Sequence, residues 1–443
     1  MTKDMTTGSP MKLIIGFAIP MFLGMLFQQF YSMVDTVIVG KFLGVEPLAG
    51  VGSTGSLNFM VIGFCTGVCN GFAVPIAQMF GARREEDLRR FVANSAWLCL
   101  IFSVVLTVLV VAFCRPILAF LNTPENIFEY AYLYIVIIFA GIPFTFLYNV
   151  LAAMIRSLGD SKSPVLFLAL ASFINIGLDL ITILVFHMGV EGPAIATVVS
   201  QGLSGIICLF YMKKKFPILR ISREEWKPKK FYLYRLCYMG IPMGLQYSVT
   251  AVGNLVVQAA VNSFGSMVVA GVTAAQRITN FLGCPVEALG GTMAAYTGQN
   301  MGAGKFDRIG KGMRDAILCG FAVSVLLLAL ALLGGRQLSM LFLDQPDEQV
   351  IGYSYQFLVT TASFYCLLTL VNVVRFTIQG MGFSVFAITS GAFEMVARSL
   401  AGLVLVPLAG YTGICFSHAL AWIFADSFLI PAYFFCMKKV RGA

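Results

Sequence analysis

Charged residues are scarce in this chain of 443 residues. They make up 12% of the sequence, whereas about a quarter is usual for soluble domains, and apolar residues make up 58%. So few charges cannot cover the surface of a soluble fold of this length. The scarcity excludes an ordinary soluble enzyme or binding module and indicates an integral membrane protein.

Patterns of catalysis and metal binding are also missing. The sequence has two His, and its 11 Cys are spread through apolar stretches without a Cys-x-x-Cys pair or a Cys/His cluster. Such cysteines are typical small buried hydrophobic residues and predict no disulfide or metal framework. No Walker motif and no Gly-x-Ser-x-Gly motif occurs. We therefore expect a protein that is not an enzyme and that needs no cofactor.

Apolar runs long enough to cross a membrane follow one another along almost the whole chain. A spanning helix needs about 20 mostly apolar residues, and the 39 Phe and 43 Gly are residue types that suit membrane helices. We predict an all-α polytopic membrane protein with twelve transmembrane helices. They are expected near residues 13–39, 48–80, 91–113, 127–155, 164–187, 190–212, 236–263, 267–298, 313–342, 350–379, 384–407 and 411–437.

The positive charges predict the orientation of these spans. Of the 30 Lys and Arg residues, most lie near the chain ends or in connections on the same side of the membrane as the ends. Lys41, Arg115 and Arg336 lie on the other side. By the positive-inside rule both termini are cytoplasmic. The basic stretch 213–235 and the net charge of +9 are then explained by anionic lipid, and no nucleic-acid partner is expected.

The second half of the chain repeats the first at an offset of about 222 residues. Matched positions occur in order, and they include Pro20 and Pro242, Gly50 and Gly271, Gln78 and Gln299, Asn149 and Asn372, and Gly159 and Gly382. Six spans in each repeat give both halves the same orientation. We therefore predict two parallel-repeat six-helix bundles around a central cleft, with residues 1–212 as an N-terminal lobe, 213–235 as a cytoplasmic linker and 236–443 as a C-terminal lobe.

Ionisable residues within membrane spans are costly and usually mark ion or substrate pathways. Asp35, Asn175, Asp179 and Thr197 are expected at one depth in the first lobe, which therefore becomes the ion-coupling lobe. Two carboxylates, an amide and a hydroxyl form an oxygen-only set that suits Na⁺, or the two carboxyl groups can share a proton. The alternative is a hydrogen-bonded clamp between helices that carries no ion.

The second repeat lacks this set. The positions equivalent to those four residues hold Val257, Arg398, Gly402 and His418, so a cation cannot bind there in the same way. Glu394 lies one helical turn before Arg398, and we expect these two to neutralise each other. For Glu287 and Asp426 we favour pairing with Arg277, Arg375 or Arg398, and a role in substrate binding is the alternative.

Two features of the spans predict backbone behaviour. Gly63, Gly67 and Gly71 give the second helix a smooth face for close packing. Pro20 lies inside the first helix and should bend it, because proline cannot donate the helical hydrogen bond.

Several segments, in order along the twelve spans, resemble the MATE (multidrug and toxic compound extrusion) family over nearly the whole chain. They are Ser32–Gly40 (SMVDTVIVG), Pro47–Gly52 (PLAGVG), Ala77–Ala82 (AQMFGA), Arg156–Pro164 (RSLGDSKSP), Asn175–Asp179 (NIGLD) and Gly192–Thr197 (GPAIAT).

The resemblance implies a bacterial antiporter of the cytoplasmic (inner) membrane that exports organic cations in exchange for a cation. It implies a coupling-ion site at Asp35, Asn175, Asp179 and Thr197, and a bend at Pro20 that takes part in transport. Family members that carry acids on the seventh and tenth helices differ from this chain, which offers only Gln246, Thr250, Asn372 and Arg375 there. A second ion site of that type is therefore not expected.

We accordingly expect secondary-active multidrug efflux in exchange for Na⁺ or H⁺ by a monomer that contacts membrane lipid and binds amphipathic cations. A flippase for a lipid-linked saccharide is the alternative, and it would need cationic side chains for a pyrophosphate. A receptor or channel is a third class, which would not need the paired carboxylates.

Overall fold

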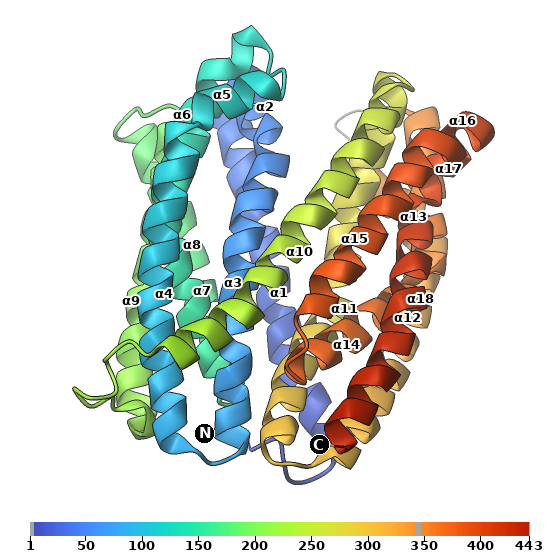
Figure 1. Ribbon diagram of the computed structural model, residues 1–443. Helices are drawn as coiled ribbons and strands as arrows, with labels where there is room; N and C mark the ends of the chain where they lie inside the picture. Colours follow the sequence, from blue (N-terminus) through green and yellow to red (C-terminus); the bar gives the residue numbers. More distant parts are fainter. Residues whose placement is uncertain (1–3, 342–346, 443) are drawn as a thin grey trace. The chain divides into compact units, whose positions relative to one another are not determined.

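The computed structural model describes residues 4–341 and 347–442, and the regular structure of these residues is helical (Figure 1). Residue 342, the predicted end of the ninth span, lies outside them. The helices of the first repeat are α1 (Pro10–Leu43), α2 (Val45–Ser53), α3 (Gly55–Gly81), α4 (Glu85–Ala112), α5 (Cys114–Phe120), α6 (Glu125–Ala140), α7 (Ile142–Ser157), α8 (Lys162–Leu184), α9 (Glu191–Lys215) and the 3₁₀ turn Pro217–Leu219.

The second repeat is also helical, with one helix, α11, where the first repeat has α2 and α3. Its helices are α10 (Lys230–Asn262), α11 (Ser266–Gly302), α12 (Phe306–Leu341), α13 (Glu348–Ser363), α14 (Tyr365–Gly380), α15 (Val385–Leu400) with a π-helical segment (Ala401–Leu405), α16 (Val406–Ala409), α17 (Tyr411–Cys415) and α18 (Ser417–Arg441).

These helices account for the twelve predicted spans. By length and composition, eight helical segments within the described residues can each cross a membrane, and two bent helix pairs supply two further spans. Helices α10 and α11, with 33 and 37 residues, complete the twelve. At about 1.5 Å per residue each is long enough to cross the hydrocarbon core.

Two spans that were predicted as single helices are broken. The pair α6 and α7 bends by 49° at Gly141, and the pair α13 and α14 bends by 50° at Phe364. In the first pair, Pro143 stands at the start of α7, where its missing N–H group weakens the helix. The two breaks occupy equivalent positions of the two repeats.

Backbone geometry repeats at other matched positions too. Gly159 and Gly382 both adopt the left-handed conformation, with φ of 90° and 99°, at the turn after α7 and after α14. A Cβ atom at Gly50 would lie 2.6 Å from the Cβ atom of Tyr130, and one at Gly271 would lie 2.8 Å from that of Tyr353. Glycine is required at these places because any side chain would be strained or would clash.

Packing divides the chain into two compact units whose limits differ from the lobes proposed from the sequence. The first unit comprises Leu23–Gly244 together with Asp4, and the second comprises Met5–Phe22 and the described residues from Leu245 onward. The chain passes from one unit to the other inside α1, two residues after Pro20, and inside α10, two residues after Pro242.

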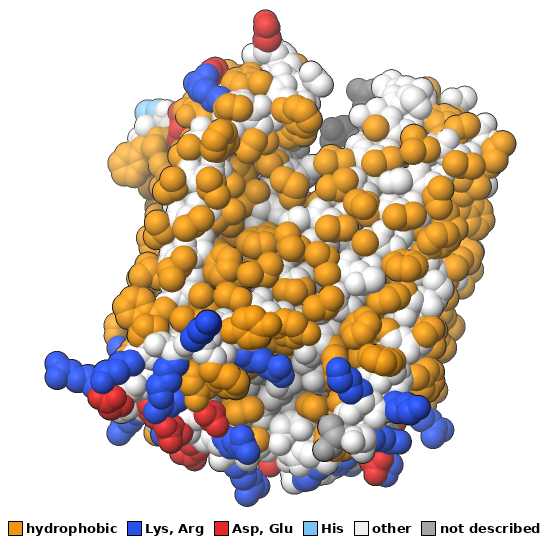
Figure 2. Space-filling view, viewed as in Figure 1, with side chains coloured by type: hydrophobic (Ala, Val, Ile, Leu, Met, Phe, Trp, Pro, Cys, Tyr) orange, Lys and Arg blue, Asp and Glu red, His pale blue; other side chains and the backbone are white. Residues whose placement is uncertain are grey.

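The outer surfaces of both units are apolar. On α4, Leu100, Ile101, Val104, Val105 and Val108 are each more than half exposed, and α12 has a similar row. Figure 2 shows apolar side chains over the middle of each unit. Lys and Arg gather at the end where α3 meets α4 in the first unit, and where α11 meets α12 in the second. Such a surface is suited to lipid.

Gly67 and Gly71 allow α3 to pack directly against the first half of α10. A Cβ atom at Gly67 would lie 2.4 Å from the carbonyl oxygen of Met243, and one at Gly71 would lie 2.5 Å from the Cα atom of Gly240. The predicted smooth face is thus confirmed at these two glycines, which hold residues up to Gly244 within the first unit.

The start of the chain packs in the second unit. The N–H group of Met5 donates to Oε1 of Gln299 at 2.9 Å, and Asn300 Nδ2 donates to the carbonyl of Met5 at 3.1 Å. Lys305 Nζ donates to the carbonyl of Thr6 at 2.8 Å. Met5 and Thr6 are therefore fixed to the α11–α12 turn.

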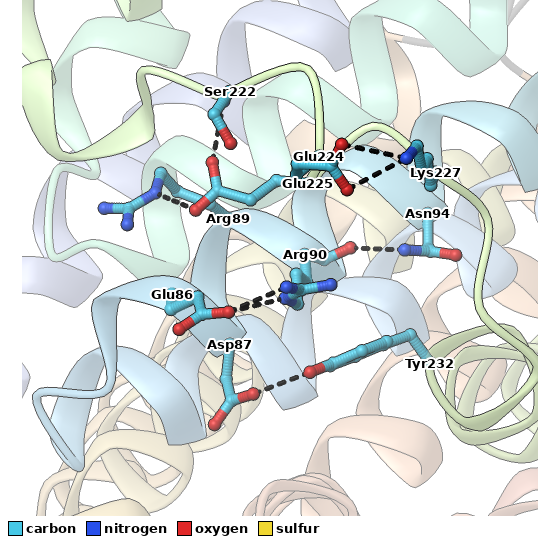
Figure 3. Close-up of polar contacts among 10 residues, drawn as sticks. All are labelled: Glu86, Asp87, Arg89, Arg90, Asn94, Ser222, Glu224, Glu225, Lys227 and Tyr232. Atoms are coloured by element: carbon cyan, nitrogen blue, oxygen red, sulfur yellow. Dashed lines mark hydrogen bonds and ion pairs between the residues drawn. The ribbon is translucent and has the colours of Figure 1, made fainter.

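The linker between the repeats is bound to α4 (Figure 3). Glu225 is 5% exposed, and its carboxylate accepts from Arg89 Nε and from the N–H group of Ser222, both at 2.7 Å. Although burial acts to raise the pKa of Glu225, the hydrogen bonds from Ser222 and Arg89 outweigh it and lower this pKa.

Further hydrogen bonds extend this attachment along the linker. Trp97 Nε1 donates to the carbonyl of Trp226 at 3.0 Å, and the N–H group of Lys229 donates to Asn94 Oδ1 at 3.0 Å. The hydroxyl of Tyr232 donates to Asp87 Oδ1 at 2.7 Å. The linker is thus part of the first unit, and the chain leaves that unit only within α10.

Replacing Glu225 with Gln should lower the free energy of unfolding by about 1.5–3 kcal/mol, because charge-assisted hydrogen bonds of a buried group are lost. The difference should be fully present above the unfolded-state pKa near 4.5 and should be lost as the pH falls through the folded-state pKa, which is lower. Thermal unfolding of the purified protein at several pH values measures both effects.

The neighbouring variant Glu224→Gln is the matched control. Glu224 is exposed and bonds only to exposed Lys227 at 2.8 Å, so its loss should leave the melting temperature nearly unchanged. Equal effects of the two variants would contradict the attachment described here.

Candidate functional site

Asp35, Asn175 and Asp179 lie together in the first unit. Asp35 comes from α1, beyond the point where this helix enters the unit, and the other two are one turn apart on α8. Asn175 and Asp179 are 2% and 0% exposed, and Asp35 is partly buried. The carboxyl groups of Asp35 and Asp179 interact directly, so two acids from different helices share one buried place.

Three oxygen atoms of this group have no hydrogen-bond donor. They are Asp35 Oδ1, Asn175 Oδ1 and Asp179 Oδ2, and each is buried. The contact within the group is long, with Asn175 Nδ2 at 3.5 Å from Asp179 Oδ1. Buried acceptors are normally satisfied, so oxygen atoms without donors point to a missing proton or cation.

Thr197 is the fourth predicted member and is joined less directly. It lies partly buried on α9, which packs against α8, and no hydrogen bond of the described structure links it to the other three. Thr182 instead donates to the carbonyl oxygen of Asp179 at 3.0 Å. A Cβ atom at Gly192 of α9 would lie 2.7 Å from Thr182 Oγ1, so the two helices approach closely beside the acids.

Two tyrosines, which were not predicted from the sequence, lie near Asp35 and Asp179. Both Tyr31 on α1 and Tyr134 on α6 lie within electrostatic range of Asp35 and Asp179. Tyr31 precedes Asp35 by one helical turn, so helical spacing could have found it. Helical spacing could not have found Tyr134, because it approaches the acids through the packing of α6 against other helices.

The equivalent region of the second unit has different chemistry. Glu394 on α15 accepts from Arg398 Nη1 at 3.1 Å, which confirms the predicted pair, and it also accepts from Arg375 of α14. Arg375, Glu394 and Arg398 are all at most 7% exposed. One carboxylate thus holds two buried arginines.

The predicted pairing of Glu287 and Asp426 with arginine is wrong. Neither acid forms an ion pair with any residue that the structure describes, and both oxygen atoms of buried Asp426 lack a partner. Arg375 and Arg398 are bound to Glu394 instead. Glu287 is exposed on α11, and Arg277 lies ten residues before it on the same helix, which corresponds to about 15 Å along the axis.

The remaining predicted polar residues are buried in the second unit. Gln246 of α10 accepts from Gln379 Nε2 at 3.0 Å, and Asn372 Nδ2 donates to the carbonyl of Leu368 at 3.1 Å. Pro20 lies inside α1, which continues through it as one helix.

Transition-metal binding has no support in this geometry. Across residues 4–341 and 347–442 no group of three or more His, Cys, Asp or Glu side chains could hold a metal ion. The group at Asp35 and Asp179 offers hard oxygen atoms only, which fit Na⁺ or a proton.

Comparison with known proteins identifies the family. The MatE family model matches residues 20–181 and 242–404, which are one segment in each repeat. The chain belongs to the MatE family. MatE proteins are membrane transporters, and the chain is therefore a multi-pass membrane transporter.

Relatives of the chain carry names of the same kind. The probable multidrug resistance protein YpnP of Bacillus subtilis is 30% identical over 82% of this chain and 80% of its own length. The probable multidrug resistance protein YoeA of the same organism is 28% identical over 83% of this chain and 80% of its own length.

A solved structure has the same fold. A multidrug resistance MATE family transporter of the MOP superfamily, in an outward-facing conformation, superposes with a TM-score of 0.91. It is 23% identical, and the match covers 100% of this chain and 99% of that one. The predicted fold class, twelve helices in two bundles, is thus confirmed for this MatE chain.

In this MatE chain, Arg398→Ala should lower the free energy of unfolding by about 3 kcal/mol, because a buried carboxylate loses one of its two partners. Transport should be kept in the folded fraction. Arg277→Ala is the control, since Arg277 is exposed and forms no ion pair in the described structure. Thermal unfolding and vesicle transport measure the two properties, and loss of transport at an unchanged melting temperature would contradict a structural role.

Proposed function

We propose that this protein exports amphipathic organic cations from the cytoplasm in exchange for Na⁺ or H⁺. The relatives named as multidrug resistance proteins support export of drugs. The observation that supports exchange with an ion is that three buried oxygen atoms, on Asp35, Asn175 and Asp179, have no hydrogen-bond donor. A transporter with no ion to bind has no need for two acids in a buried place.

The coupling ion binds at this group in the proposal. Asp35 and Asp179 supply the charge, Asn175 supplies its amide oxygen, and Thr197 is the fourth ligand from the adjoining α9. Na⁺ would take these oxygen atoms as direct ligands, whereas H⁺ would be shared between the two carboxyl groups. A flippase for lipid-linked saccharides is disfavoured, because Arg375 and Arg398 are already bound to Glu394.

Exchange follows from the repulsion between the two acids. Without a cation, two carboxylates in one low-dielectric place repel each other, and an arriving ion removes this repulsion. We infer that the relief lets α1 bend at Pro20 and that the bend lowers the affinity for the drug. Because coupling free energies are reciprocal, the bound drug lowers the affinity for the ion by the same factor.

The protein acts in the bacterial cytoplasmic membrane in this proposal, with both termini in the cytoplasm. The basic ends of both units, at the α3–α4 and α11–α12 turns, would face anionic lipid on that side (Figure 2). A single copy contains both repeats, so we propose that the monomer is the working unit.

Asp35→Asn and Asp179→Asn should each reduce ion-driven transport by about tenfold or more, because the site loses the charge that binds the ion. The measurement is uptake of a fluorescent cation into inverted vesicles, with a Na⁺ gradient and a pH gradient applied separately. Wild type should respond to at least one gradient. Glu46→Gln, at an exposed acid of α2, is the control and should transport as wild type does.

Drug affinity measured at several Na⁺ concentrations and pH values completes this test. It should depend on one of the ions in wild type and on neither in Asp35→Asn. If the drug affinity of wild type changes with neither Na⁺ concentration nor pH, the proposed exchange is wrong. If both Asn variants transport as wild type does, the proposed location of the ion site is wrong.

Pro20→Ala should slow turnover while ion binding persists. Alanine restores the helical hydrogen bond to the carbonyl of residue 16 and stiffens α1. Stopped-flow transport gives the turnover rate, and quenching of protein fluorescence by the ion gives its affinity. Pro75→Ala, which changes a proline inside α3, is the control for a general effect of proline removal. An unchanged turnover in Pro20→Ala would contradict the bend as the coupling step.

A further inference from the structure

Four ionisable side chains lie together in the second unit, apart from the acids of the first unit. Arg375 comes from α14, Glu394 and Arg398 from α15, and Asp426 from α18, which packs against both. Their exposed fractions lie between 4% and 7%. We refer to these four residues as the second-unit cluster.

Donors and acceptors are mismatched within this cluster. Both carboxylate oxygen atoms of Asp426 lack a hydrogen-bond partner, and so do the Nε atoms of Arg375 and Arg398. No Lys, Arg or His nitrogen of the described residues lies within ion-pair distance of Asp426. Burying an ionised carboxylate without a partner is far more costly than burying the neutral acid.

Two charges of opposite sign lie near Asp426. Arg375 and Glu394 both act on it electrostatically, with opposite signs. On its own helix, His418 stacks on the ring of Trp422 and meets the ring of Phe357 edge to face. Of the other helices that contact α18, α12 has no charged residue between Asp315 and Arg336, and α17 contributes Tyr411 and Cys415 as titratable groups.

The proton on Asp426 therefore decides the net charge of the cluster. Two arginines remain cationic at any physiological pH. With Glu394 ionised, the cluster carries one positive charge when Asp426 is protonated and no charge when it is ionised. Arg375 is the cation that both acids can attract, since Arg398 alone can continue to hold Glu394 at 3.1 Å.

We propose that Asp426 is a proton-binding site and that Arg375 exchanges between Glu394 and Asp426 as the proton leaves. In this step the Asp426 hydroxyl gives its proton to water, and the carboxylate that remains accepts hydrogen bonds from the Arg375 guanidinium. The bond from Arg375 to Glu394 breaks, while Arg398 keeps Glu394 paired. The site takes only a proton, and it requires nothing of the ion exchange proposed for the first unit.

Infrared difference spectroscopy tests the proton directly on the full-length purified protein. Spectra at acid minus alkaline pH should contain the carbonyl band of a buried protonated carboxylic acid that is missing in Asp426→Asn. The double variant Asp35→Asn with Asp179→Asn should keep this band, so the result does not depend on the proposed exporter function. Asp426→Asn resembles the neutral acid in shape and charge and should fold. A wild-type spectrum that Asp426→Asn leaves unchanged would overturn the proposal, as would a band that titrates with Na⁺ in place of pH.

The exchange of Arg375 is tested by removing its present partner. In Glu394→Gln, Arg375 should turn to Asp426, and the midpoint at which the Asp426 band titrates should move to a proton concentration about tenfold higher or more. Arg375→Gln should move the midpoint the opposite way and serves as the second variant if Glu394→Gln does not fold. His418→Gln is the control and should leave the band in place. An unchanged midpoint in either Arg375→Gln or folded Glu394→Gln would refute the exchange.

Discussion

The hydrocarbon core of a bilayer offers no water to backbone amide groups, and the rest of this structure follows from that constraint. Every span is helical, and the helical hydrogen bonds are weakest at the prolines. Pro143 accompanies the bend between α6 and α7. Pro20 and Pro242 lie two residues before the points at which α1 and α10 pass from one unit to the other. Helices thus change their packing partners where a proline has already removed a hydrogen bond.

The two repeats kept their backbone and diverged in their side chains. Gly159 and Gly382 have the same unusual φ, and Gly50 and Gly271 make the same contact with a tyrosine. Yet the position of Asn175 in the first repeat is occupied by Arg398 in the second. The first unit therefore buries acceptor oxygen atoms that have no donor. The second buries both donors and acceptors without partners, namely the Nε atoms of Arg375 and Arg398 and the carboxylate oxygen atoms of Asp426. A duplicated scaffold can in this way carry two kinds of ionisable site.

Sequence reasoning succeeded where one helix or a run of apolar residues carried the information. The twelve spans followed from long apolar runs, and the Glu394–Arg398 pair followed from helical spacing. It failed where three helices meet. Nothing in the order of residues indicates that Arg375 reaches Glu394 and leaves Asp426 unpaired, because this depends on distances across α14, α15 and α18. The same holds for Tyr134, and for residues 5–22, whose bundle is set by packing.

The attachment of the first residues to the α11–α12 turn has a consequence for biogenesis. Met5 bonds to Gln299, which is 294 residues later in the chain, and the sulfur atoms of Met11 and Cys319 meet across 308 residues. Residues 5–22 can therefore complete their packing only after the ninth span has been synthesised. Until then the half of α1 before Leu23 lacks the surface that it packs against, so the second unit can complete its tertiary structure only after its own later spans have joined a segment from the other end of the sequence.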